Sequence, residues 1–130
     1  MENEKRIIIA GSRNYSDYES VKKELDTYIE NLTEKPSIIT IISGNAEGAD
    51  KLGERYACEN NYLLKLFKAN WKAGGHAGFI RNARMADFAS LKNGVLFAFW
   101  DGKSNGTRHM IDCAKKYKLE IHIIYSTQQE

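Results

Sequence analysis

The stretch Ile38-Ile39-Thr40-Ile41-Ile42-Ser43-Gly44-Asn45-Ala46-Glu47-Gly48-Ala49-Asp50 decides the fold of this chain. Its first five residues are β-branched with no polar alternation, which is typical of a strand buried on both faces of a parallel sheet. The strand pattern stops at the glycine turn, and a helical pattern runs from about Ala46 to Glu59. A strand, a glycine turn and a helix in this order point backbone N–H groups and a helix dipole at an anion. An ordinary βα turn that binds nothing is the alternative interpretation of this stretch alone.

Four more strand patterns and three more helical patterns alternate along the chain. Strands joined by helices in the order βαβαβαβαβ form a parallel sheet with right-handed crossovers. The sequence therefore predicts an α/β fold, a Rossmann-like three-layer sandwich with a five-stranded parallel sheet in the order 3-2-1-4-5. Residues 38–42 should be interior, whereas the more amphipathic residues 62–67 are typical of an edge strand. The expected strands are residues 7–10, 38–42, 62–67, 94–100 and 119–125, and the expected helices are residues 18–32, 46–59, 79–91 and 107–117.

Length and composition indicate one globular domain that spans residues 1–130. A net charge of +2 is too small to favour nucleic acid or a membrane surface by itself. The charged start predicts no signal peptide, and no apolar run approaches the length of a membrane span. Cys58 and Cys113 stand alone in helical patterns, so we expect both to be reduced and buried in a cytoplasmic protein. No spacing of cysteine or histidine suggests a metal site, and no cofactor is expected.

Three glycine-rich turns should meet at one edge of the sheet. In a 3-2-1-4-5 sheet, ligands bind beyond the carboxyl ends of the strands where the strand order reverses, between the first and fourth strands. The turns that follow the first, second and fourth strands are Gly11-Ser12-Arg13, Ser43 to Asp50, and Asp101 to Thr107. Glycines and small hydroxyl or amide residues are the groups that hold phosphate. The sequence therefore predicts one anion-binding site built from these turns.

Several side chains near this edge allow both a structural and a functional interpretation. Arg13 could clamp a phosphate or remain solvated, and Asp50 could cap a helical turn or hold a ribose hydroxyl. Trp71 could stack on a base or simply pack its glycine-rich loop. Thr107 is an expected helix N-cap that would also suit a phosphate. The candidate ligand-binding residues are Gly11, Ser12, Arg13, Ser43, Gly44, Gly48, Asp50, Trp71, Arg81, Asn82, Gly106 and Thr107.

These motifs, taken in order, resemble those of the SLOG superfamily. The matching elements are Gly11-Ser12-Arg13, Ser43-Gly44-x-Ala46-x-Gly48-Ala49-Asp50, Tyr56-Ala57-Cys58, Ala69-x-Trp71, Gly78-x-x-Arg81-Asn82-x-x-Met85 and Gly106-Thr107-x-x-Met110. The nearest branch comprises the small bacterial and phage proteins called YspA, or cpYpsA-related. The resemblance runs from about Arg6 to Ile124 and implies a Rossmann-like fold with a site for a nucleotide or nucleotide-derived ligand.

A related branch of that superfamily, the cytokinin-activating phosphoribohydrolases, cleaves the N-glycosidic bond of nucleoside monophosphates. The resemblance to this branch implies the same reaction, but one position of this sequence departs from the branch's pattern. Their sites use an Arg four residues before a Met, as Arg81 stands before Met85 here, and a Glu three residues after a Gly-Thr pair. Met110 occupies that Glu position in this chain. Cleavage of a glycosidic bond needs a carboxylate, which Met does not supply. The candidate catalytic residues are therefore Arg81 together with Glu47, Asp50 or Asp101 as a substitute carboxylate.

Three functions remain open from the sequence. The first is binding of a nucleotide-derived small molecule, as a sensor, carrier or sequestering protein. The second is a nucleotide N-glycosidase or hydrolase, which the Met at position 110 disfavours. The third is binding of single-stranded nucleic acid, which would require a basic and aromatic groove. The slight net charge ranks nucleic acid last as a partner, no membrane partner is expected, and a homo-oligomer is compatible with the sequence.

Overall fold

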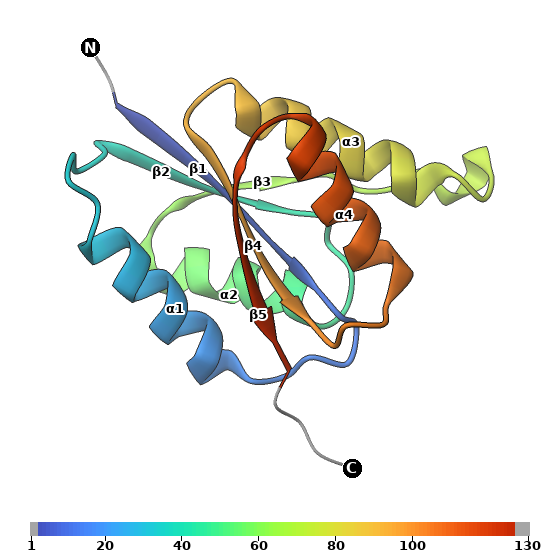
Figure 1. Cartoon of the computed structure of the whole chain (residues 1–130), viewed down its shortest axis with the longest axis horizontal. Helices are drawn as coiled ribbons and strands as arrows, with labels where there is room; N and C mark the ends of the chain where they lie inside the picture. Colours follow the sequence, from blue (N-terminus) through green and yellow to red (C-terminus); the bar gives the residue numbers. More distant parts are fainter. Residues whose placement is uncertain (1–2, 127–130) are drawn as a thin grey trace.

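The computed structural model describes residues 3–126 as a five-stranded, all-parallel sheet with a helix in each connection (Figure 1). The strand order is β3-β2-β1-β4-β5, which confirms the predicted Rossmann-like α/β fold and the 3-2-1-4-5 order. The strands are β1 (Glu4–Gly11), β2 (Ile38–Ser43), β3 (Leu63–Leu66), β4 (Gly94–Trp100) and β5 (Glu120–Tyr125). The helices are α1 (Tyr18–Glu30), α2 (Ala49–Asn60), α3 (Ala77–Ser90) and α4 (Asn105–Lys116), with a short 3₁₀ helix η1 (Trp71–Ala73) before α3.

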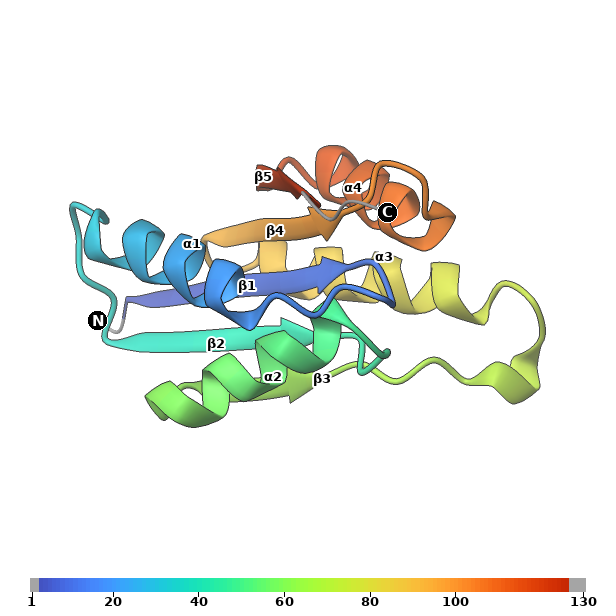
Figure 2. The same ribbon diagram turned by 90° about the horizontal axis from the view of Figure 1, so that it is seen from below.

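The helices cover both faces of the sheet and give the predicted three layers. Helices α1 and α2 lie on one face, and α3 and α4 lie on the other (Figure 2). Alternate residues of β1 enter the two cores: Ile7 packs with the α1 and α2 residues, and Ile8 packs with those of α3 and α4. Both side chains are fully buried, as expected for the central strand of a sheet with helices on both faces.

The unalternated isoleucines of β2 occupy the predicted interior position. Ile41 pairs with Ile7 of β1 on one side and with Leu64 of β3 on the other, and it is fully buried. The prediction of an edge strand near residues 62–67 is also confirmed, because β3 pairs only with β2 and exposes its three leucines. The central position of β1 and β4 places the turn after β1 beside the turn after β4, where Ser12 N–H donates to Phe99 O at 3.0 Å.

Three helices begin elsewhere than predicted, among them α3, which begins at Ala77 rather than at residue 79, and the predicted burial of one cysteine is wrong. Helix α2 begins at Ala49 rather than Ala46, because Gly48 has φ +86° and cannot belong to the helix. The N-cap of α4 is Ser104 rather than Thr107. The carboxylate of Asp101 accepts the N–H groups of Lys103 and Ser104, both at 2.8 Å, and this turn starts the helix earlier. Cys113 is buried as expected, but Cys58 is exposed on α2; both are free thiols.

Within residues 3–126, no helix is both long and apolar enough to cross a membrane.

Candidate functional site

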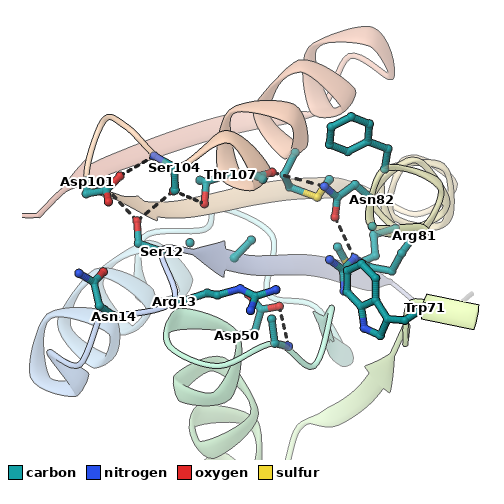
Figure 3. Close-up of a pocket in the computed structure, with 18 of the residues that line it drawn as sticks. Ser12, Arg13, Asn14, Asp50, Trp71, Arg81, Asn82, Asp101, Ser104 and Thr107 are labelled. Atoms are coloured by element: carbon teal, nitrogen blue, oxygen red, sulfur yellow. Dashed lines mark hydrogen bonds between the residues drawn. The ribbon is translucent and has the colours of Figure 1, made fainter. Parts of the chain in front are cut away.

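A cavity of about 440 Å³ lies beyond the carboxyl ends of β1 and β4, where the strand order reverses. We call it the inner cavity. Its walls come from the turns after β1 and β4, from η1, from the start of α2, and from residues 78–85 of α3 and 106–110 of α4 (Figure 3). Its size falls within the range of small-molecule sites. The lining comprises Ala10, Gly11, Ser12, Arg13, Asn14, Ala46, Asp50, Trp71, Gly75, Gly78, Phe79, Arg81, Asn82, Met85, Asp101, Ser104, Gly106, Thr107 and Met110.

The wall at α4 carries hydroxyl groups and the amino end of a helix. Ser104 Oγ donates to Thr107 Oγ1 at 3.2 Å and lies 3.2 Å from Ser12 Oγ, so the three hydroxyls form a chain between β1 and α4 (Figure 3). The first N–H groups of a helix have no partner inside the helix. At Gly106, no atom outside its own helical turn lies within 4 Å of where a Cβ would stand, so there is open space beside this turn. This end of α4 can therefore accept an anion.

The wall at α3 carries Arg81, which is held in place by its neighbours. Its Nη1 donates to the carbonyl of Gly44 at 2.7 Å, and its Nε donates to Oδ1 of Asn82 at 3.0 Å. The amide nitrogen of Asn82 in turn lies 3.4 Å from the carbonyl of Gly106 and 3.2 Å from Nδ1 of His109. Because Asn82 is buried and its amide is used in this way, its main effect is to orient Arg81 and join α3 to α4.

Asp50 is the buried carboxyl group of the inner cavity. It is 6% exposed, and its Oδ2 accepts the N–H of Ala46 at 3.2 Å. Burial raises the pKa of Asp50 to about 6, although the Ala46 N–H and the positive charge of Arg81 oppose the shift. A Cβ at Gly44 would stand 2.9 Å from both Asp50 Oδ2 and Arg81 Nη1, so the glycine lets the carboxyl group and the guanidinium group both lie close to the backbone here. The prediction that Asp50 caps the helix is wrong, because its carboxyl group bonds the loop before α2 rather than the helix end, but Asp50 does line the cavity.

The amino end of α2 does not face the cavity in the way that the sequence predicted. The N–H of Ala49 donates to the carbonyl of Ser12 at 3.3 Å, so a backbone oxygen already occupies this helix end. Gly48 lies against the same turn, and a Cβ there would collide with the carbonyls of Ser12 and Arg13. Ser43 is fully buried and donates to Glu54 Oε2 at 2.7 Å. Ser43 and Gly48 therefore shape the βα turn but do not line the inner cavity, and the amino end of α4 replaces that of α2 as the open helix end.

Two aromatic side chains stand at the mouth of the inner cavity. Trp71 in η1 is 60% exposed, and its ring lies 3.3 Å from where a Cβ of Gly78 would stand. Phe79 is 46% exposed and stacks on the ring of His109, with centroids 4.1 Å apart. Burial lowers the pKa of His109, which favours the neutral imidazole beneath Phe79. Exposed aromatic faces beside cationic groups are suited to a planar ring of a ligand.

A second cavity of about 360 Å³, the outer cavity, adjoins the first. The two share Arg13, Ala46, Trp71 and Arg81 as walls. Gly44 and Glu47 line only the outer cavity, so Glu47 is not placed with Asp50. The remaining outer lining residues are Asn45, Lys68 and Ala69.

The structure brings together most of the residues that the sequence singled out, and it adds others. Gly11, Ser12, Arg13, Asp50, Trp71, Arg81, Asn82, Gly106 and Thr107 all line the inner cavity. Phe79 and Ser104 were missed, although each stands at the start of a helix, two residues before a predicted site residue. Met110 also lines the cavity, so the departure from the phosphoribohydrolase pattern lies at the site itself. Among residues 3–126, no cluster of His, Cys, Asp and Glu side chains could hold a metal ion.

Comparison with known proteins agrees with this geometry. The model of the YspA, cpYpsA-related SLOG family matches residues 5–74. The chain is 32% identical over 123 residues to the Gene 61 protein of Mycobacterium phage D29, an alignment that covers 90% of this chain and 94% of the phage protein. No solved structure gives a significant match. With the SLOG motifs converging on one edge of a Rossmann-like sheet, the chain belongs to the YspA, cpYpsA-related SLOG family.

Proposed function

We propose that this protein binds a nucleotide or a nucleotide-derived small molecule in the inner cavity, as a sensor, carrier or sequestering protein. One observation carries the proposal. Two guanidinium groups, Arg13 and Arg81, and the open amino end of α4 line the same cavity as the aromatic rings of Trp71 and Phe79. Guanidinium and helix N–H groups favour phosphate, and aromatic faces favour a base. Membership of the SLOG family supports the same ligand class.

Binding to nucleoside monophosphates tests the proposal directly. Affinity would be measured by isothermal titration calorimetry for AMP, GMP, CMP and UMP with the wild type, Arg81→Ala and Arg84→Ala. Arg84 is the matched control because it is exposed on the same helix and lines neither cavity. We expect Arg81→Ala to weaken binding about tenfold or more, the usual cost of a charged hydrogen-bonding partner. Arg84→Ala should change affinity by less than about twofold. Equal effects of the two variants, or no binding of any nucleotide, would refute the proposal.

Hydrolysis of the N-glycosidic bond is the second candidate, and Asp50 is the observation that favours it. A buried carboxyl group with a pKa of about 6 beside an Arg is suited to proton transfer near neutral pH. Against it, Met110 is 1% exposed in the cavity wall, where related enzymes place a Glu. A positioned acid or base contributes about 10²- to 10⁴-fold in rate, so we expect binding with little turnover.

Release of free base from AMP, followed by chromatography, separates the two functions. We expect negligible release by the wild type under conditions where AMP is bound. Met110→Glu should raise the rate if position 110 is where a carboxylate acts, at some cost in stability from the buried charge. Rapid release by the wild type that Asp50→Asn abolishes would instead make this an enzyme with Asp50 as its carboxylate.

A further inference from the structure

The outer side of helix α3 carries four exposed side chains in one row. Helix α3 packs against the sheet and against α4 (Figure 1), and the row lies on the side that these contacts leave exposed. The row, which we call the α3 stripe, consists of Ile80, Arg84, Asp87 and Leu91. Spacings of four, three and four residues place side chains on one face of a helix. Leu91 is the C-cap of α3 and keeps a helical backbone conformation, so the stripe extends to it.

The stripe combines apolar ends with unpaired charges in the middle. Ile80 is 55% exposed and Leu91 is 67% exposed. Among residues 3–126, neither Arg84 nor Asp87 forms a salt bridge or a side-chain hydrogen bond. Scattered apolar residues are ordinary on protein surfaces, whereas apolar residues grouped on one face mark interaction sites. The stripe therefore has the composition of an interface and offers one cation and one anion to a partner.

The order of the stripe is self-complementary. It reads apolar, basic, acidic, apolar, and its midpoint falls halfway between Arg84 and Asp87. A two-fold axis places one residue opposite a second residue of the partner, and the second opposite the first. When two copies of α3 pack antiparallel about an axis at this midpoint, Arg84 lies level with the partner's Asp87. Ile80 then lies level with the partner's Leu91, and each of these pairs occurs twice.

We propose that the α3 stripe is the interface of a two-fold symmetric dimer, in which the α3 helices of two copies of this chain pack antiparallel. The apolar pairs supply the contact area, and the ion pairs fix the direction, because a parallel arrangement would place Arg84 against the partner's Arg84. The surface is small, so we expect a dissociation constant on the order of 10–100 µM and a monomer in dilute solution. No residue of the stripe lines either cavity, so this inference is independent of the proposed function.

The edge strand β3 is the competing surface for a second copy. It exposes Leu63, Leu64 and Leu66. A lysine in the middle of an edge strand, as Lys65 is here, opposes pairing with another strand. Pairing at β3 would also leave both charges of the α3 stripe without a partner. The experiment therefore includes the variant Leu64→Lys, which should associate like the wild type.

Sedimentation velocity of the full chain over a concentration series tests the dimer. The wild type should change from monomer to dimer between about 1 and about 500 µM. Arg84→Asp places an acid opposite the partner's Asp87, and Asp87→Arg places a base opposite the partner's Arg84. Each variant has two like-charge contacts in its dimer and should associate about tenfold or more weakly than the wild type. Asp112→Arg makes the same charge change at an exposed residue of α4 and should associate like the wild type.

Mixing the two weakened variants gives the sharpest measurement. In a mixed dimer, the two acids of Arg84→Asp meet the two bases of Asp87→Arg at both contacts. An equimolar mixture should therefore form dimers at concentrations where each variant alone is a monomer, with an association constant within about threefold of the wild-type value. Restored association also shows that both variants are folded.

Three outcomes would overturn the assignment. A wild type that stays monomeric over the whole concentration series would leave the α3 stripe without a second copy as its occupant. A mixture of the two charge variants that stays monomeric would exclude the antiparallel pairing. A dimer that both charge variants retain and Leu64→Lys loses would place the interface on β3 instead.

Discussion

Asp50 is a buried carboxyl group whose protonation links the stability of the fold to pH. Its pKa is raised from 3.8 to about 6, mainly by burial, so the folded protein keeps a proton that the unfolded chain releases between these values. The stability that comes from this proton is fully present below about pH 4 and is lost as the pH rises through about 6. At neutral pH the ionised Asp50 therefore makes the folded state less stable than a neutral group of the same shape would.

The variant Asp50→Asn should remove this dependence. We expect the free energy of unfolding of Asp50→Asn, relative to the wild type, to increase between pH 4.5 and pH 7.5, on the order of 1–3 kcal/mol. Urea unfolding followed by circular dichroism at both pH values measures the difference. A difference between variant and wild type that is independent of pH would contradict the assignment of a raised pKa.

Asp101 serves as the control, because its pKa is shifted in the opposite direction to that of Asp50. The N–H groups of Ser104 and Lys103 lower the pKa of Asp101, so its contribution to stability is present at neutral pH and is lost as the pH falls. Asp101→Asn should therefore destabilise the protein at pH 7.5 and lose that effect in acid. The two aspartates line one cavity but respond to pH in opposite directions.

At the scale of elements, the turn between β2 and α2 depends on Gly48, which packs against the backbone of the turn after β1. Gly48 has φ +86°, and a Cβ would meet the carbonyls of Ser12 and Arg13. We expect Gly48→Ala to lower the free energy of unfolding by about 2 kcal/mol or more, because the conformation is strained for alanine and the two turns cannot separate without losing the bond from Ala49 to Ser12. Thermal and urea unfolding measure this loss.

Gly106→Ala is the matched control for that prediction. Gly106 is the second residue of α4 and, unlike Gly48, has no positive φ, and a Cβ there would enter open space. The same methyl group in the first turn of α4 should change stability by less than about 1 kcal/mol. If both variants were equally stable, the close contact at Gly48 would contribute nothing to the free energy of unfolding.

At the scale of the whole molecule, the two hydrophobic cores on opposite faces of the sheet meet at β1. We expect both cores to unfold in one cooperative transition. Ile7 and Ile8 are fully buried on opposite faces of the sheet. Replacing either with Ala should cost about 2–5 kcal/mol, since each removes three carbons from a well-packed core. Ile80→Ala, at a side chain 55% exposed on α3, should cost less than about 0.5 kcal/mol.

Cooperativity is tested by following the unfolding of these variants with two probes. Tryptophan fluorescence, to which Trp100 in the core under α3 and α4 contributes, and far-ultraviolet circular dichroism should give the same midpoint. Separate midpoints for Ile7→Ala would show that the two faces unfold independently.

The fold of this protein could be derived from the amino-acid sequence because its signals are local. The unalternated isoleucines of β2 require burial on both faces, and the regular alternation of strands and helices then restricts the topology to a parallel sheet. The same rules place the turns after β1 and β4 side by side, which is why Ser12, Arg13, Gly106 and Thr107 could be assigned to one edge before their positions were known.

Tertiary packing decided which of the grouped residues face the cavity. The sequence alone presents the turns before α2 and α4 as equivalent anion sites. Only the packing of the turn after β1 against Gly48 brings the carbonyl of Ser12 to the amino end of α2 and leaves that of α4 open. The presence of Arg13 and Arg81 in the wall of one cavity depends likewise on two elements far apart in sequence. Contacts between distant segments have no local pattern, because they are set by the shapes of the packed elements.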